Sequence, residues 1–136
     1  MTDFKINNIV KKQKDFFATG KTLSIDFRID ALKRLKNAIV KYDNEIEQAI
    51  KADLGKSGFE SYMCETGMGK SEIADMIKNI KKFAKEKTVK TPMSNFAARS
   101  FVKPVPYGNV LIMSPWNYPF LLTLDPLTDA LAAGNT

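Results

Sequence analysis

The hexapeptide Ser-Pro-Trp-Asn-Tyr-Pro at residues 114–119 contains the side chain with the clearest chemical use in this chain. Asn117 carries a neutral carboxamide, which donates hydrogen bonds without needing a proton or a metal ion. Pro115 and Pro119 restrict the backbone on either side, so the amide is held in a rigid turn. A rigid amide donor suits the stabilisation of an oxygen that becomes negatively charged during a reaction. We therefore interpret Asn117 as a candidate oxyanion-binding residue.

Two predicted elements position this turn. Residues 109–113 form a short apolar run, which is typical of a strand buried on both faces in a parallel sheet. Residues 120–132 carry apolar side chains at helical spacing, with Pro126 inside the pattern and Gly134 as a cap. Open parallel sheets bind ligands where a strand ends and a helix begins. The alternative interpretation is a packing corner in which Trp116 and Tyr118 fill a core.

The residues before this unit predict helices. Residues 4–18 mix apolar side chains with lysines and precede Gly20, which indicates a short amphipathic helix. After Ser24, apolar residues recur at steps of three and four as far as Ile50. This stripe predicts a long helix, whole or broken near residues 43–44, that ends at residues 55–58.

A second long helix is expected from Phe59 to Phe83, antiparallel to the first and weakened locally at Gly67 and Gly69. The pattern then changes, because a threonine and a proline at residues 91–92 interrupt the helix. Residues 96–105 alternate loosely in the manner of an exposed strand. Prolines at 104 and 106 suit a sheet edge or a connector.

Composition narrows the function classes. The chain has 136 residues, a net charge of +6 from 21 basic and 15 acidic residues, no histidine and one cysteine. The basic residues are mostly lysine, whereas base readout favours arginine, so we do not expect nucleic-acid binding. Histidine-based catalysis and structural zinc within this chain are excluded, and we predict no metal site. No apolar run is long enough for a membrane span, and we expect a cytoplasmic protein.

Three further features have structural rather than chemical interpretations. Residues 69–71, Gly-Lys-Ser, match the end of a phosphate-binding loop, but Cys64 stands where its first glycine belongs, so a helix with small residues at a close crossing is favoured. Cys64 has no histidine partner and is interpreted as a buried small hydrophobic residue. Carboxylates such as Glu45, Glu60 and Glu72 are interpreted as solvated charges.

A resemblance to a known family rests on residues 106–120, Pro-Tyr-Gly-Asn-Val-Leu-Ile-Met-Ser-Pro-Trp-Asn-Tyr-Pro-Phe, together with Ala-Ala-Gly-Asn at 132–135. They resemble the first cofactor-domain strand and helix of NAD(P)-dependent aldehyde dehydrogenases. The class 3 branch, which acts on fatty and aromatic aldehydes, is the most similar, since residues 118–120 and Pro126 follow its pattern. Residues 27–56 resemble its helical lead-in.

The resemblance implies an α/β fold, with a helical lead-in at residues 1–87 and a connector with an oligomerisation-type strand at 88–106. Residues 107–136 would begin a Rossmann-like cofactor domain that is truncated. It implies a small-molecule aldehyde as substrate, NAD or NADP as cofactor and a homodimer. It also assigns the site residues: Asn117 to the oxyanion hole; Met113, Ser114, Pro115 and Trp116 to the cofactor; and Tyr118 and Leu122 to the substrate tunnel.

In that family a cysteine attacks the aldehyde and a glutamate activates water, and both lie downstream of position 136. We therefore expect an amino-terminal part of an aldehyde dehydrogenase that is inactive alone. The alternative is a non-catalytic helical interaction or dimerisation module derived from that family, with the exposed tail binding a partner strand.

Overall fold

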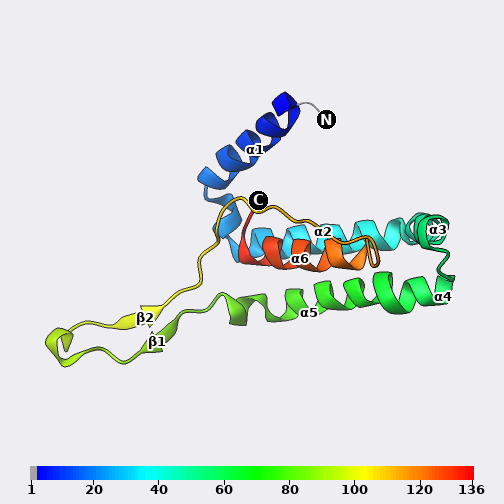
Figure 1. The fold of residues 1–136 in the computed structure, drawn as a ribbon. Coiled ribbons are helices and arrows are strands. Elements are labelled where there is room, and N and C mark those ends of the chain that lie inside the picture. Colours follow the sequence, from blue (N-terminus) through cyan, green and yellow to red (C-terminus); the bar gives the residue numbers. More distant parts are fainter. Residues whose placement is uncertain (1–2) are drawn as a thin grey trace.

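The computed structural model describes residues 3–136, with side chains from residue 5 onward. Three helices, α2 (Ile25–Lys41), α5 (Gly67–Phe83) and α6 (Leu121–Ala133), lie side by side as the body of the molecule (Figure 1). Helix α5 runs antiparallel to α2, as the sequence predicted, and α6 runs in the direction of α5. A slender hairpin projects from one end of this body, and α1 (Asp3–Ala18) projects from its side.

The first three helices lie within about a residue of their predicted bounds. Helix α1 ends before Gly20, which has a left-handed φ of 71°, and a short 3-10 turn, η1 (Lys21–Leu23), leads to α2. The hydroxyl of Ser24 caps α2 by accepting a hydrogen bond from the backbone N–H of Phe27. The predicted stripe breaks at Tyr42, and α3 (Asp43–Leu54) ends at Gly55, whose φ is 70°.

The second predicted helix begins with two unusual turns. Ser57 caps the four-residue α4 (Gly58–Ser61), and a five-residue π-helix, η2 (Tyr62–Thr66), follows it before α5. Gly67 stands where the π-turn meets α5, and a Cβ there would lie 2.5 Å from the Tyr62 carbonyl oxygen. The sequence predicted a local weakening at Gly67 and Gly69, whereas the structure places the wider π-turn just before them and keeps both glycines in α5.

The core lies between α2, α5 and α6. Leu124 on α6 packs against α5 at Gly69, where a Cβ would collide with the leucine side chain. The absence of a side chain at Gly69 therefore lets the two helices approach closely, which confirms the predicted close crossing. The buried apolar residues that form this core cluster are Leu32, Ile39, Ile73, Ile80, Leu124 and Ala132.

The projecting hairpin contains two short strands. Strand β1 (Lys87–Val89) pairs antiparallel with β2 (Ser100–Val102), and Thr88 lies opposite Phe101. A 3-10 turn, η3 (Met93–Asn95), lies between them. The predicted exposed strand within residues 96–105 is thus confirmed for β2, whereas its partner β1 was not predicted.

The predicted buried strand at residues 109–113 is wrong over most of its length. The segment has no regular secondary structure, and Leu111 and Met113 are exposed. Its only ladder contact in the part of the chain described here is to Thr136, which donates to the Gly108 carbonyl at 2.8 Å and accepts from the Val110 N–H at 3.0 Å. These two bonds have the pattern of a parallel strand pair around one residue. A strand is stable when a neighbouring strand pairs with it along its whole length, and here a single residue, Thr136, pairs with this segment.

The carboxyl end of α6 is anchored by Arg28 from α2. Its buried guanidinium donates to the carbonyls of Thr22 at 2.6 Å, Leu23 at 3.1 Å and Ala132 at 3.2 Å. Gly134 follows with a left-handed φ of 92°, and the Asn135 side chain accepts a hydrogen bond from the Gly108 N–H at 3.0 Å. The start of the loop between β2 and α6, residues 103–120, is thereby tied to the end of α6, and we call it the site loop.

No helix among residues 3–136 is long and apolar enough to cross a membrane.

Candidate functional site

The predicted site residues lie on the loop between β2 and α6 and on the first turn of α6. Met113 and Trp116 are 85% and 80% exposed, so the structure leaves the predicted cofactor residues on an open surface. Ser114 and Pro115 between them are exposed as well. All four side chains are exposed, and that of Ser114 is also hydrogen-bonded to Thr123 on α6.

Tyr118 and Leu122, the predicted tunnel residues, do meet. They line a pocket of about 260 Å³, and its other lining residues are Cys64, Met68 and Leu121. Cys64 and Met68 come from η2 and α5, so the pocket joins the loop to the second helical segment. Cys64 is partly exposed in this pocket, and its interpretation as a buried residue is therefore wrong.

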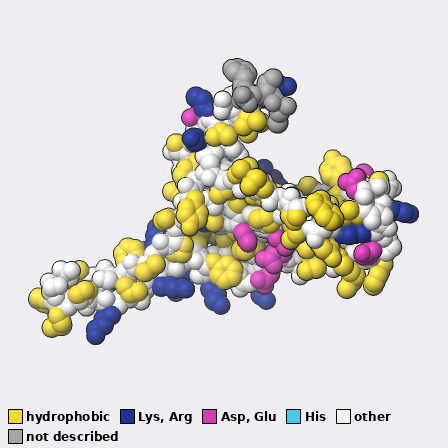
Figure 2. Space-filling view, viewed as in Figure 1, with side chains coloured by type: hydrophobic (Ala, Val, Ile, Leu, Met, Phe, Trp, Pro, Cys, Tyr) yellow, Lys and Arg dark blue, Asp and Glu magenta, His cyan; other side chains and the backbone are white. Residues whose placement is uncertain are grey.

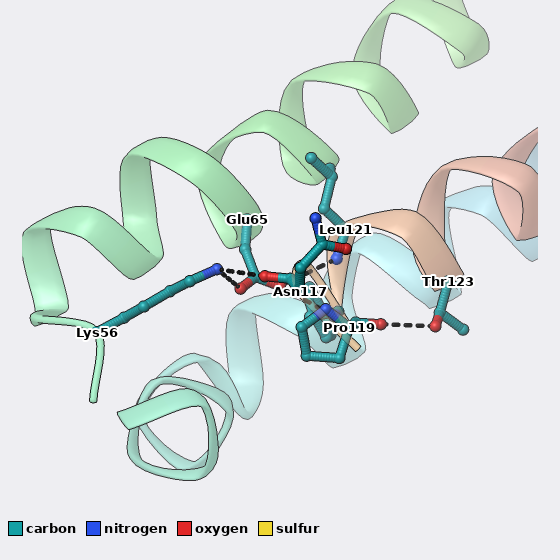
Figure 3. Close-up of polar contacts among 7 residues, drawn as sticks. Lys56, Glu65, Asn117, Pro119, Leu121 and Thr123 are labelled. Atoms are coloured by element: carbon teal, nitrogen blue, oxygen red, sulfur yellow. Dashed lines mark hydrogen bonds and ion pairs between the residues drawn. The ribbon is translucent and has the colours of Figure 1, made fainter. Parts of the chain in front are cut away.

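Asn117 is held through its backbone. Its carbonyl oxygen accepts a hydrogen bond from Lys56 Nζ at 3.1 Å (Figure 3). No hydrogen bond joins its exposed carboxamide to any residue in the described range. The amide is therefore free to donate to an incoming oxygen, while the chain that carries it is restrained.

The hydroxyl of Thr123 fixes the loop on its other side. It lies 2.6 Å from Ser114 Oγ and 2.6 Å from the carbonyl oxygen of Pro119. A carbonyl only accepts, so Thr123 donates its single hydrogen to Pro119 and accepts from Ser114. This bond brings one predicted cofactor residue against the first turn of α6.

Two residues missed by the sequence interpretation lie directly behind Asn117. Lys56, just after α3, and Glu65, in η2, form an ion pair with 2.6 Å between Nζ and Oε1. The Glu65 side chain is 0% exposed, and its second oxygen accepts from the backbone N–H groups of Phe120 at 2.9 Å and Leu121 at 3.3 Å. One signal was available, because Glu65 is the only charged residue between Glu60 and Lys70.

These contacts revise the expected ligand site at the start of α6. The free N–H groups of a helix start can bind an anion, but here the Glu65 carboxylate already occupies two of them. An anionic ligand group therefore could not use these two N–H groups while Glu65 holds them. The loop residues 113–116 remain accessible.

Acidic side chains gather along the seam between α5 and α6, where Figure 2 shows them close together. Burial raises the pKa of Glu72, and the carboxylates of Asp129, Asp125 and Asp75 raise it further. Burial and Asp129 also raise the pKa of Asp125. Glu72 is only partly exposed, so it is less solvated than its interpretation from the sequence implied.

The remaining candidate motifs have structural roles. The Gly-Lys-Ser sequence at 69–71 lies within α5, as favoured, and Lys70 forms an ion pair with Asp43 at 2.8 Å. Across residues 3–136, no three or more histidine, cysteine, aspartate or glutamate side chains are grouped so that they could hold a metal ion.

Known proteins resemble this chain along its whole length. The model of the aldehyde dehydrogenase family matches residues 1–136. A 4,4'-diaponeurosporen-aldehyde dehydrogenase of Staphylococcus aureus is 43% identical over 133 residues, which are 95% of this chain and 29% of that protein. The mouse aldehyde dehydrogenase family 3 member B3 is 37% identical over 126 residues, 93% of this chain and 26% of that protein.

A solved structure gives the same result in three dimensions. The substrate-bound state of Staphylococcus aureus AldH matches with a TM-score of 0.91 and 41% identity, over 100% of this chain and 29% of that one. The match confirms the predicted fold class, an amino-terminal helical segment leading into an aldehyde dehydrogenase-type domain. The chain thus spans less than a third of the length of these relatives. From the family match and the shared fold, we conclude that the chain belongs to the aldehyde dehydrogenase family.

Proposed function

We propose that this chain is the amino-terminal part of an NAD(P)-dependent aldehyde dehydrogenase of the class 3 branch. The whole protein would oxidise an aldehyde to a carboxylic acid through a cysteine thioester, with the nucleophile beyond residue 136. NAD or NADP, when bound, would accept the hydride. The family match and the free carboxamide of Asn117 on a restrained backbone support this proposal.

In this proposal Asn117 donates a hydrogen bond to the aldehyde oxygen. Attack by a thiolate on the carbonyl carbon leaves a negative charge on that oxygen, and a second such charge develops when water attacks the thioester. A neutral amide stabilises both without transferring a proton. The exposed carboxamide of Asn117 and the fixed carbonyl behind it suit this task.

The neighbouring residues would divide between the two ligands. Met113, Ser114, Pro115 and Trp116 would line the nicotinamide end of the cofactor, which agrees with their accessible position on the loop. Tyr118 and Leu122 would form one wall of the aldehyde tunnel, which agrees with their almost wholly apolar pocket. An apolar wall suits the hydrocarbon part of an aldehyde.

The hairpin supports a homodimer as the second proposal. Apolar residues remain uncovered on it, including Met93 at 86% and Phe96 at 82% exposure. Exposed apolar groups of this size commonly mark protein contacts. The same surface would serve a non-catalytic dimerisation module, so association alone does not decide between the two. We further propose that residues 1–87 are a helical lead-in, that 88–106 are a connector with an oligomerisation-type strand, and that 107–136 begin a cofactor-binding domain. We also propose that the whole protein is cytoplasmic.

The activity can be tested by joining these 136 residues to the remainder of Staphylococcus aureus AldH that follows the matched segment. We call this the joined protein. With an aldehyde and NAD or NADP, it should form carboxylic acid and reduced cofactor in equal amounts, whereas the 136-residue chain alone should form neither. A folded joined protein without this activity, beside active AldH, would contradict the proposal. So would turnover by the chain alone.

A further inference from the structure

The buried pair of Lys56 and Glu65 directs all its remaining polar contacts to the site loop. In addition to its bond with Glu65, Lys56 donates to the carbonyl oxygen of Asn117, and its Nζ lies 4.0 Å from the centroid of the Tyr118 ring. Glu65 contacts the N–H groups of Phe120 and Leu121. One ion pair therefore holds the backbone both before and after Pro119 (Figure 3).

Stability alone is a poor explanation for this pair. Desolvation of two charges offsets much of their attraction, and replacing a buried pair by apolar residues of similar volume is often neutral or stabilising. What an apolar pair cannot supply is a donor for the Asn117 carbonyl and an acceptor for the start of α6. Helix α6 has no side-chain cap of its own and no acidic residue in its first turn, so Glu65 provides the missing cap from another helix.

The local backbone also favours a specific placement of Glu65. It lies in the π-turn η2, and turns of this kind are frequent at functional sites. Glu65 and Thr66 in this turn are buried, while Tyr62 and Met63 are exposed. The turn thus directs a carboxylate inward from a helical segment whose neighbouring residues are uncharged.

We propose that Lys56 and Glu65 are positioning residues for the oxyanion donor. This inference rests on the proposed function of Asn117. By fixing the carbonyl of Asn117 and the two amides that follow Pro119, the pair holds the carboxamide where the reacting oxygen forms. Small displacements of such groups are costly, since a shift of about 1 Å can lower a rate by about a hundredfold.

The test uses the joined protein with both charges removed, Lys56→Met with Glu65→Leu. This double variant should remain folded, but its kcat should fall by about ten- to a hundredfold with little change in KM, because the donor is displaced and not lost. The matched control is Lys70→Met with Asp43→Leu, which removes an ion pair with 2.8 Å between Nζ and Oδ2 that does not touch the loop. Its kcat should stay within about twofold of the unmodified value.

A second comparison separates positioning from general damage. In a protein that already carries Asn117→Ala, removing the Lys56–Glu65 pair should lower kcat by no more than about twofold, since there is no donor left to misplace. Two results would overturn the inference and leave the proposed function intact. One is a loss of kcat, on removal of the pair, that is as large with Asn117→Ala as without it. The other is an unchanged kcat in the double variant Lys56→Met with Glu65→Leu. An inactive joined protein would refute both.

If the double variant does not fold, Glu65→Gln in the 136-residue chain provides the second measurement. It keeps the side-chain size but replaces the carboxylate, which accepts from the N–H groups of Phe120 and Leu121, by a neutral amide. Amide hydrogen exchange at these two residues should accelerate relative to Glu45→Gln, an exposed glutamate on α3. Equal exchange in both variants would overturn the inference.

Discussion

Replacing Gly134 by alanine tests how the end of α6 is fixed. Gly134 has a φ of 92°, and a Cβ there would lie 2.7 Å from the Thr22 carbonyl oxygen and 2.9 Å from the Arg28 guanidinium carbon. Both neighbours are confined, because Arg28 is buried and hydrogen-bonded to three carbonyls. The added methyl group must therefore displace this network.

The expected loss has two parts. A left-handed backbone costs a residue with a Cβ about 1–2 kcal/mol. Displacing Arg28 weakens at least one hydrogen bond from a charged donor, at about 1.5–3 kcal/mol each. We expect Gly134→Ala to lower the free energy of unfolding by about 2.5–5 kcal/mol, the sum of these ranges.

The matched control is Gly55→Ala. Gly55 also has a left-handed φ, 70°, but nothing lies within 4 Å of its Cβ position. The backbone strain and the effect of alanine on the unfolded chain are therefore shared, and only the collision differs. Urea unfolding of the 136-residue chain, followed by far-ultraviolet circular dichroism, should give a difference of about 1.5–3 kcal/mol between the variants. Equal losses would refute the anchoring of α6 by Arg28.

Three further predictions concern the acidic seam, the helix crossing and the hairpin. Because the pKa values of Glu72 and Asp125 are raised above their ordinary values of 4.5 and 3.8, the folded state binds these protons more tightly. The stability of the folded state should therefore fall as the pH rises through the raised pKa values. In thermal unfolding, Glu72→Gln with Asp125→Asn should make this fall with pH less steep. An unchanged slope of stability against pH would contradict the prediction. Gly69→Ala should lower the free energy of unfolding by up to about 2 kcal/mol, because overpacking against Leu124 outweighs the better helix propensity of alanine. In a Leu124→Ala background the same change should raise the free energy of unfolding by about 1 kcal/mol. The same sign in both backgrounds would refute the close crossing. Phe96→Ser should shift the joined protein toward monomer in sedimentation velocity, and an unchanged distribution would remove this part of the hairpin from the proposed interface.

Local patterns predicted the helices well. The stripe after Ser24, the cap residues and the glycines at 20, 55 and 134 are features of neighbouring residues, so the sequence alone contains the information. The interrupted stripe at residue 42 was likewise visible. The motif around Asn117 indicated the family because several uncommon residues occur in a fixed order.

The unpredicted features depend on residues far apart in the chain. The pairing of β1 with β2 and the single ladder contact of residue 109 with Thr136 need partners that no local pattern specifies. Glu65 interacts with α6 only because a π-turn directs it inward and α5 packs against α6. Lys56 stands in an ordinary helix connection, and its proximity to Asn117 spans 61 positions in sequence.

The most direct test of the central claim is the turnover number of the joined protein with Asn117→Ala. Losing one oxyanion donor should lower kcat by about a hundred- to a thousandfold. The control is Asn95→Ala, which removes an exposed carboxamide from the distant hairpin and should leave kcat unchanged. If Asn117→Ala turns over as fast as Asn95→Ala, Asn117 does not stabilise the oxyanion, and the proposed role of this loop is wrong.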